Sequence, residues 1–331
     1  MKRALLLLVL IACGSKKAAR EDAGPGSGSQ SAGSGSNAGS GDAQAELVKL
    51  DAACTASDAE ACRKLAIVYE EGLAGTAIDH TKATLLFRKA CDGKNLAACN
   101  QLALAIAEGI GVPKNPVVAV ELYQRTCDAG YKLACRNLGL MVRDGRGVAV
   151  DLARAATLLD AACMASTAYA CTNAGDLDAT RATSAPDDGA RAQHYKEMIA
   201  HYKKGCDDGD PTSCRNLGIA YLEGKALPTS TTAASVWLSR ACRLDEPIAC
   251  RVLGAMTIQG IGVPKDVDAG VQMLKRACDR KDTEACTAMT AIAAAGSNSA
   301  TGSNSGSGSN SVAGSNSGSG PSSAAGSDSP K

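Results

Sequence analysis

Large and small apolar residues recur at fixed distances along the middle of the chain, between residues 44 and 295. Alternation with a period of two, which a half-buried strand would show, is absent, and Ala, Leu, Lys and Arg dominate. Large side chains set against small ones at fixed offsets suit helices that pack closely side by side. The pattern therefore predicts an all-α region. The recurring positions are Leu65–Ala66, Leu102–Ala103, Leu138–Gly139, Leu217–Gly218 and Leu253–Gly254, and Phe87, Tyr123, Leu159, Tyr202, Leu238 and Leu274.

Cysteines mark the period of this pattern. Fourteen of the fifteen form seven pairs with seven residues between the members, and successive pairs start 36 or 37 residues apart, save one step of 43. A fixed period in this range is typical of repeat proteins built from stacked supersecondary units. The pairs are Cys54–Cys62, Cys91–Cys99, Cys127–Cys135, Cys163–Cys171, Cys206–Cys214, Cys242–Cys250 and Cys278–Cys286.

Each period predicts a helix, a turn and a second helix. In the second period a helix begins near Leu96 and ends at Gly109, as a left-handed C-cap, and Asn115 caps the next helix with Pro116 in its first turn. Asp79, Asp151 and Asp266 stand where Asn115 does. The turn "GIGVPK" occurs at 109–114 and again at 260–265. A phosphate-binding loop would need a preceding strand, so these glycines are predicted to be hinges between helices.

Small residues, "G-x-G-V" and a following Asp together resemble the Sel1-like repeat, a relative of the tetratricopeptide repeat. The regular cysteine pairs are similar to those of the cysteine-rich branch found in secreted bacterial proteins. The resemblance spans residues 44–295. It implies an α/α solenoid (superhelix) of about six helix pairs plus flanking helices, and a protein or peptide partner rather than a substrate.

The cysteine pairs predict seven disulfides, each linking the nearest two cysteines. The members of a pair lie near adjacent ends of antiparallel helices, at bridging distance. Zinc is the weaker alternative, because structural zinc sites favour closer cysteines with histidine partners and the chain has three histidines. Unpaired core thiols would leave the periodic pairing unexplained.

The first residues predict export and a lipid anchor. Lys2 and Arg3 precede a short apolar stretch that ends in "LIAC", which resembles the lipobox of bacterial lipoproteins, with Cys13 lipidated. Gly14 after the cysteine implies, by that resemblance, the outer membrane. The predicted divisions are a signal peptide at 1–12, a lipidated cysteine and Gly/Ser-rich tether at 13–43, the solenoid at 44–295 and a disordered tail at 296–331. The predicted location is the bacterial cell envelope.

Composition and motifs narrow the function further. The formal net charge is +1 with acids and bases interspersed, which disfavours nucleic-acid binding. Some cysteine-rich relatives are associated with β-lactamase activity, but S-x-x-K, S-D-N and K-T-G are all absent from the sequence. The predicted protein is therefore no enzyme, with no catalytic residue, cofactor, metal or small-molecule substrate. β-Lactam binding or weak hydrolysis remains the alternative.

One period breaks the pattern. Between Cys171 and Cys206 lie seven extra residues, within a stretch, "DATRATSAPDDGARAQ", that predicts a longer loop. His194 and His201 are seven residues apart, so they share one face of the following helix. They indicate either a ligand or partner site, or simply a longer loop with a half-buried histidine.

Overall fold

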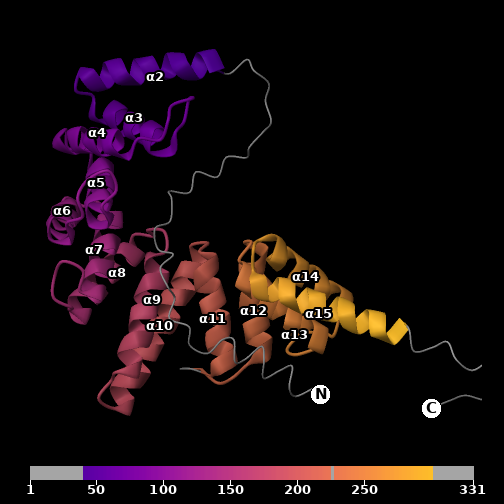
Figure 1. The fold of residues 1–331 in the computed structure, drawn as a ribbon. Coiled ribbons are helices and arrows are strands. Elements are labelled where there is room, and N and C mark those ends of the chain that lie inside the picture. Colours follow the sequence, from indigo (N-terminus) through magenta and orange to yellow (C-terminus); the bar gives the residue numbers. More distant parts are fainter. Residues whose placement is uncertain (1–39, 225–226, 301–331) are drawn as a thin grey trace, which may run out of the picture. The chain divides into compact units, whose positions relative to one another are not determined.

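The computed structural model describes residues 40–224 and 227–300, and all regular structure in these ranges is helical (Figure 1). The fourteen helices within them form six hairpins, α3–α4 to α13–α14, flanked by α2 and α15. This confirms the predicted solenoid of about six helix pairs with flanking helices. The bounds are α2 Ser40–Thr55, α3 Ala59–Glu71, α4 His80–Asp92, α5 Leu96–Glu108, α6 Pro116–Asp128, α7 Lys132–Asp144, α8 Leu152–Met164, α9 Ala170–Thr183, α10 Asp188–Asp207, α11 Pro211–Glu223, α12 Thr231–Arg243, α13 Pro247–Gln259, α14 Val267–Asp279 and α15 Thr283–Ala300.

The first and last helices extend past the predicted limits of the solenoid. Helix α2 begins at Ser40 and α15 ends at Ala300, where residues 44 and 295 were expected. The chain divides into two compact units between Met289 and Thr290. Within the described ranges, no helix is both long and apolar enough to cross a bilayer.

Helix ends follow the cap signals in the sequence. The Asn115 side chain accepts a hydrogen bond from the Val118 N–H at 3.2 Å, and Asp79, Asp151 and Asp266 cap their helices in the same way. Gly109 ends α5 with a φ of 79°, in the left-handed region that favours glycine. The predicted N-caps and the glycine C-cap are therefore confirmed.

The second glycine of the turn has a role that the sequence did not suggest. Gly111 has a φ of 68°, and a Cβ placed on it would lie 2.2 Å from the backbone oxygen of His80, the first residue of α4. Gly147 and Gly262 approach the backbone of Pro116 and Thr231 equally closely, at the starts of α6 and α12. The second glycine thus brings the turn of one helix pair against the backbone of the pair before it.

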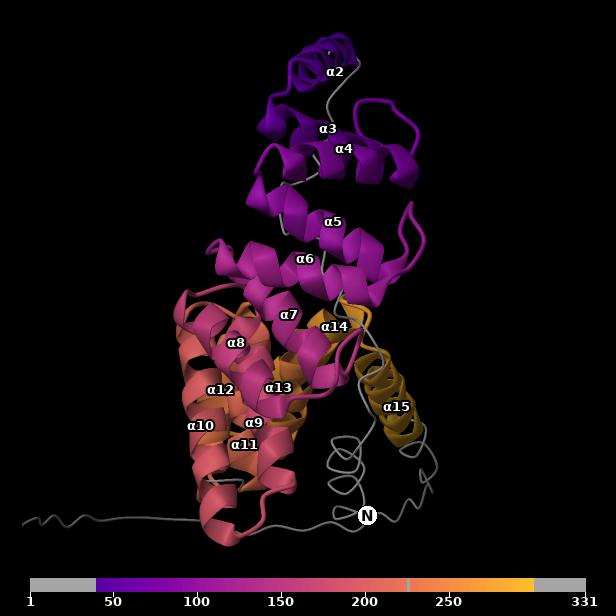
Figure 2. The ribbon, with the colours of Figure 1, turned by 90° about the vertical axis from the view of Figure 1, so that its left-hand side faces the viewer.

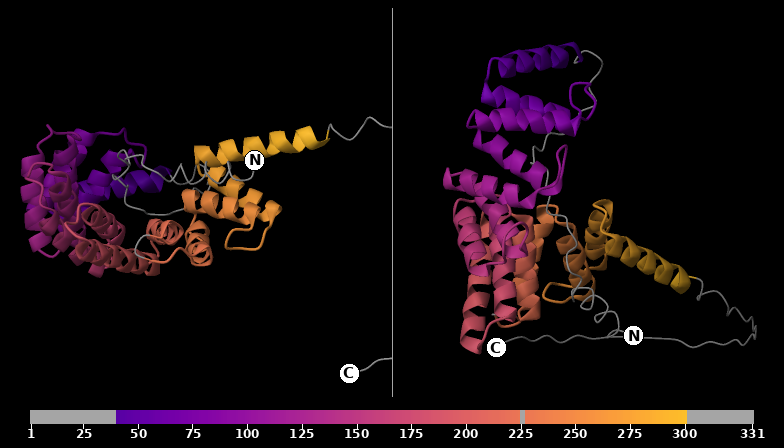
Figure 3. Two further views of the ribbon diagram at one scale, coloured as in Figure 1. Left: turned by 90° about the horizontal axis from the view of Figure 1, so that it is seen from below. Right: turned by 60° about the vertical axis from the view of Figure 1, so that its left-hand side comes forward.

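All seven cysteine pairs are disulfides in the structure. Each joins the last turn of one helix to the first turns of the next, with Cα–Cα distances of 4.5 to 4.7 Å. Three residues separate the two helices at six of these junctions, and five separate α8 from α9. Because each bridge lies outside the hairpins, the first fixes α2 to α3 and each of the others fixes one helix pair to the following helix. Figures 2 and 3 show this sequential order of hairpins from other sides.

The apolar core is divided along the chain. One large cluster of buried side chains extends from Cys54 in α2 to Leu177 in α9, and a second extends from Cys206 to Ala285. Between them lies a small cluster of Met198, Tyr202, Leu217 and Ala220. The large apolar clusters are therefore interrupted at the α9–α10 hairpin, the part of the chain where the repeat pattern breaks.

The seven extra residues in that hairpin lengthen its helices, so the predicted long loop is wrong. Helix α10 has 20 residues and α9 has 14, where the helices of the other hairpins have 13. The connection is only residues 184–187, because Pro186 makes the turn and Asp187 caps α10 through the Ala190 N–H at 2.8 Å. Alanine, arginine and glutamine around this turn are good helix formers. The connected end of α9 and α10 projects beyond α8 (Figure 2).

Candidate functional site

Asparagines on successive first helices form a row, which we call the amide row: Asn100 in α5, Asn137 in α7, Asn173 in α9 and Asn216 in α11. The Asn137 amide donates to Asn100 Oδ1 at 2.9 Å, and Asn216 donates to Asp176 Oδ1 of α9 at 3.2 Å. Asn173 Oδ1 accepts from the Arg136 guanidinium at 2.7 Å. Side-chain hydrogen bonds therefore connect four consecutive helix pairs along one face of their first helices.

Arginines beside the row extend these links to the cap residues of the following helices. Arg215 Nη1 lies 2.8 Å from Glu246, the N-cap of α13, and Arg251 Nε lies 3.1 Å from Asp282. Both acids are less than a tenth exposed, and both arginines less than a fifth. Burial makes each pair dependent on its partner, because an unpaired buried charge is costly.

The row was not predicted from the sequence, although its signal is present there. The string "CRNLG" occurs at Cys135 and again at Cys214, and arginine or asparagine follows the second cysteine in five of six first helices. The third and fourth residues after the second cysteine are apolar and define the repeat, whereas the first and second residues are polar and form these links.

In the α9–α10 hairpin, polar side chains stand at two positions that carry mostly apolar side chains in the other hairpins. Asp178 stands seven residues after the second cysteine, where other first helices carry Tyr69, Ile106, Val142 and Tyr221. His201 stands where other second helices carry Leu86, Leu122, Leu158, Trp237 and Met273. The two positions contact each other in α13–α14 too, where the Thr257 hydroxyl lies 3.9 Å from the Met273 sulfur. In α9–α10 this contact is a charged hydrogen bond.

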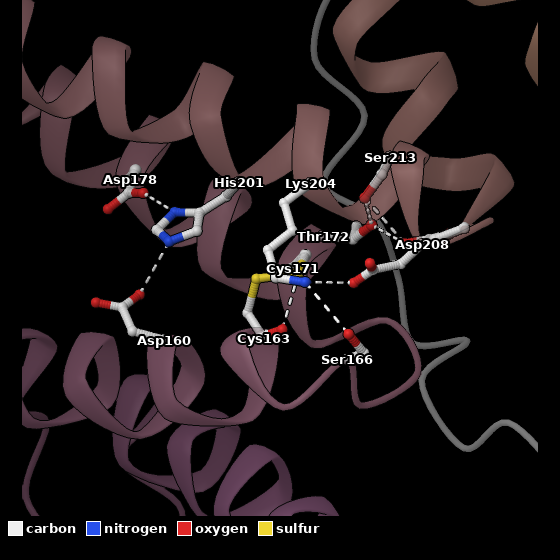
Figure 4. The surroundings of a disulfide bond; sticks show 11 residues. Asp160, Cys163, Ser166, Cys171, Thr172, Asp178, His201, Lys204, Asp208 and Ser213 are labelled. Atoms are coloured by element: carbon white, nitrogen blue, oxygen red, sulfur yellow. Dashed lines mark hydrogen bonds and ion pairs between the residues drawn. A yellow bond between two sulfur atoms is a disulfide. The ribbon is translucent and has the colours of Figure 1, made fainter.

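His201 joins three helices (Figure 4). Its Nδ1 lies 2.8 Å from Asp178 Oδ2 in α9 and its Nε2 lies 3.3 Å from Asp160 Oδ1 in α8. Burial acts to lower the pKa of His201, but the hydrogen bond to Asp178 and the charges of Asp178, Asp160 and Glu197 outweigh it, so its pKa is raised. Burial also raises the pKa of Asp160, against the opposing charge of His201. The arrangement places the imidazole between two carboxyl groups and favours its protonated form.

His194 takes part in the same network at a greater distance. Its Nδ1 lies 3.1 Å from Glu197 Oε2, and one ligand atom each from Asp178, His194 and Glu197 lie within 4.8 Å of one another. These three residues could hold a metal ion. However, the Arg181 guanidinium lies 3.3 Å from Asp178 and 3.8 Å from Glu197, so a cation of the protein itself already pairs with both carboxylates. The geometry therefore fits an ion-pair network better than a metal centre.

The structure thus brings His194 and His201 into one network, on one face of α10, as their spacing predicted. His201 is the half-buried histidine expected, with 18% of its side chain exposed. The sequence did not indicate its partners, because Asp160 and Asp178 lie on other helices. Cys13, the predicted tether up to residue 39 and the tail from residue 301 lie outside the described residues.

Comparison with known proteins agrees with the repeat geometry. Residues 59–95, 96–131, 132–166, 211–246 and 247–282 match the family model described as the Sel1 repeat. The α9–α10 hairpin falls in the gap between the third and fourth of these segments. A comparison with curated protein sequences gave no match.

Two solved structures show the same fold. The chain is similar to a protective antigen of uropathogenic Escherichia coli with an SLR fold (TM-score 0.61, 24% identity, 74% of this chain), and spans about half, 51%, of that protein. It is also similar to a Sel1 repeat protein from Oxalobacter formigenes (TM-score 0.55, 22% identity), covering 69% of this chain and 87% of that one. Helicobacter pylori cysteine rich protein B shares 24% identity over 42% of this chain and 94% of its own length, with a TM-score of 0.33.

Proposed function

The chain belongs to the Sel1 repeat family, and from this we propose that it is a cell-envelope lipoprotein whose solenoid binds a protein or peptide partner. Stacked repeats bury little within one unit and present long surfaces made of equivalent positions from successive units. Such surfaces serve recognition, because they place similar side chains at regular intervals along a partner.

The amide row is the observation that carries the proposal. It repeats one kind of side chain on four consecutive first helices, and Asn137 and Asn216 remain partly exposed. Amide side chains both donate and accept hydrogen bonds, so they can pair with the backbone of an extended segment. Arg136 and Arg215 donate hydrogen bonds to Asn137 and Asn216 and hold these side chains in place, which reduces the entropy lost on binding.

Seven disulfides fit an extracytoplasmic location, because such bridges persist in oxidising compartments. We propose that a lipid on Cys13 anchors the chain to the envelope, on the strength of the "LIAC" motif. Labelled palmitate should enter the wild-type chain in cells and fail to enter a Cys13→Ser variant, which should leave the membrane fraction. Equal labelling of the wild type and the Cys13→Ser variant would contradict the proposed lipid anchor.

We propose further that the protein is not an enzyme. The fourteen repeat cysteines are bonded in pairs, which removes their thiolates as nucleophiles, and the histidines of α10 are held in ion pairs. The purified, oxidised protein should turn over nitrocefin no faster than buffer. Turnover above buffer that survives repurification would support the β-lactamase alternative instead.

Site-specific photo-crosslinking tests the binding role. A photoreactive side chain at Asn137 or Asn216 should give discrete adducts in intact envelopes, whereas one at the exposed Val236 of a second helix should not. An Asn137→Ala and Asn216→Ala double variant, carrying the photoreactive group at Leu140, should lose the adducts at least tenfold. Equal adducts at Val236 and at the row would contradict a partner bound along the first helices.

A further inference from the structure

The bridge between Cys278 and Cys286, which joins α14 to α15, differs from the other six bridges in its exposure. Both of its cysteines are partly exposed, whereas each of the other bridges has at least one buried cysteine. The bridge Cys54–Cys62, at the opposite end of the helical repeats, is the clearest contrast, because its two residues are only 3% and 1% exposed. Exposure is therefore a property of Cys278–Cys286 and not of end bridges in general.

Little apolar packing accompanies this bridge at the start of α15. Ala285 is the only buried side chain that the structure describes in α15, and Met289 is partly buried against the same apolar cluster. Arg251 of α13 adds two ion pairs, at 3.1 Å to Asp282 and at 3.0 Å to Glu284. Opening of this junction therefore separates little buried apolar surface, and regions with few buried apolar contacts open most readily.

The helix ends make the two sulfurs of the bridge unequal. Cys278 lies in the last turn of α14, and Cys286 is the fourth residue of α15. The N-terminus of a helix stabilises a thiolate, whereas the C-terminus disfavours a negative charge. In thiol–disulfide exchange the more stable thiolate is the better leaving group. An attack on the sulfur of Cys278, with Cys286 as the leaving thiolate, is therefore the favoured direction.

We propose that Cys278–Cys286 is a redox-sensitive joint, which a dithiol reductant opens while the other six bridges stay closed. One thiolate of the reductant bonds to the sulfur of Cys278, the bond between the two cysteines breaks, and Cys286 leaves as a thiolate. The second thiolate of the reductant then attacks the reductant's own sulfur in the mixed disulfide, and Cys278 leaves. The two cysteines take up the two protons that the dithiol gives up. The reductant is thereby oxidised to a disulfide, and the bridge is reduced by two electrons.

The two ends of the helical repeats would then respond differently to thiols. Reduction of Cys278–Cys286 frees the start of α15 from α14, whereas the buried bridge Cys54–Cys62 keeps α2 tied to α3. This inference does not depend on the partner proposed above, because it concerns a bridge of the chain itself and its reaction with a dithiol.

Timed reduction of the oxidised full chain with dithiothreitol tests the proposal. Samples are quenched at intervals with N-ethylmaleimide, and mass spectrometry of the peptides measures the labelled fraction of each cysteine. Cys278–Cys286 should be reduced at least about tenfold faster than Cys54–Cys62. The bridges with one partly exposed cysteine, Cys91–Cys99 and Cys127–Cys135, should have intermediate rates. Equal rates at the two end bridges, or earlier reduction of any other bridge, would overturn the proposal.

The same measurement in guanidinium chloride is the matched control. All seven bridges join cysteines that are eight residues apart, so in the unfolded chain they close loops of one size. Their rates should then agree to within about threefold, because the differences in burial are gone. An order of reduction that survives denaturation would arise from the local sequence and would overturn the assignment to the fold.

Glutathione, a monothiol, identifies the sulfur that is attacked. Its reaction can be quenched with acid at the mixed disulfide, and the glutathione should then be found on Cys278, with Cys286 as the free thiol. The reverse distribution would overturn the proposed direction of attack.

Hydrogen exchange tests whether the bridge holds α15 in place. In the chain reduced and alkylated at Cys278 and Cys286 alone, exchange should rise in residues 283–289, while α3 stays protected. Unchanged exchange in residues 283–289 would show that the bridge does not hold α15, and would overturn its role as a joint.

Discussion

At the scale of single residues, glycine decides how closely adjacent helix pairs approach. Gly111 needs its small size for two reasons: a positive φ, and a backbone oxygen of the preceding pair where a Cβ would be. Gly130 has a φ of 97° as well, yet a Cβ on it would meet nothing within 4 Å. The two glycines therefore separate the cost of the backbone conformation from the cost of the contact.

Gly111→Ala should lower the free energy of unfolding by several kcal/mol, because the methyl group forces the turn away from His80. Gly130→Ala should cost only about 1–2 kcal/mol, the penalty for a left-handed non-glycine residue. Denaturant titration of both variants measures the difference. Equal losses would mean that the close approach at Gly111 contributes nothing beyond backbone strain.

His201 should make stability depend on pH. Its pKa is higher in the folded protein than in the unfolded chain, so the stabilisation is complete below the unfolded value of about 6.5 and is lost as the pH rises through the folded value. The charged groups that act on the imidazole are Asp160 on α8, Asp178 on α9 and Glu197 on α10, and Arg181 on α9 pairs with the last two. The free energy of unfolding of the wild type, relative to His201→Gln, should therefore fall as the pH is raised above neutrality.

Denaturant titrations at intervals from pH 5.5 to 8.5 check this dependence, with His201→Gln as the chain that cannot titrate at this position. A difference between the two chains that stays constant, or that grows with pH, would contradict a histidine held protonated by its partners.

At the scale of helices, the regular hairpins could be predicted and the irregular one could not. Caps, turns and disulfides follow the period of 36 residues, so one correctly assigned unit, such as Leu96–Asp128, assigns the others. The insertion in α9–α10 contains Pro186 and Gly189, which suggested a loop, but both lie at the turn and first helical residues, where they are tolerated. The partners of His201 come from other helices, and no local spacing encodes such contacts.

The buried pair Asp178–His201 should be replaceable by an apolar pair of the kind found in the other hairpins. Asp178→Val alone and His201→Leu alone should each destabilise, by up to about 3 kcal/mol, because each removes one partner of a buried charge. The double variant should return to within about 1 kcal/mol of the wild type, a coupling that a double-mutant cycle measures. Asp160→Asn, at a half-exposed partner, should cost less than about 1 kcal/mol. Additive losses in the double variant would show that the two positions act independently.

At the scale of the whole molecule, stability is local, because the helices contact mainly their neighbours in sequence. Each disulfide closes a short loop and is worth about 2.5 kcal/mol in the chain-entropy model. The two large core clusters meet at α9–α10, where the packing is most polar. Removal of the disulfide at one junction should therefore destabilise the adjoining helices before the rest of the solenoid.

Replacing the cysteines of a terminal bridge, Cys54→Ser with Cys62→Ser, should raise hydrogen exchange in α2 and α3 alone. Replacing those of the central bridge, Cys163→Ser with Cys171→Ser, should raise it from α8 to α10 and leave α3 and α13 protected. Exchange measured by mass spectrometry distinguishes the helices. An even rise along the chain in either variant would indicate a single cooperative unit instead.

The contact between Gly111 and the backbone of α4 also bears on how such a chain can grow. The partner of the glycine is a main-chain carbonyl, so the contact does not depend on which side chains the preceding pair carries. A tandem duplication of one 36-residue stretch would therefore add a helix pair that already packs against its neighbour. The α9–α10 hairpin lacks this glycine turn and has changed length, whereas α11–α12, with Ala226 in place of the second glycine, keeps helices of 13 residues. Whole periods can be copied where the turn is kept, and its loss permits a change of length without requiring one.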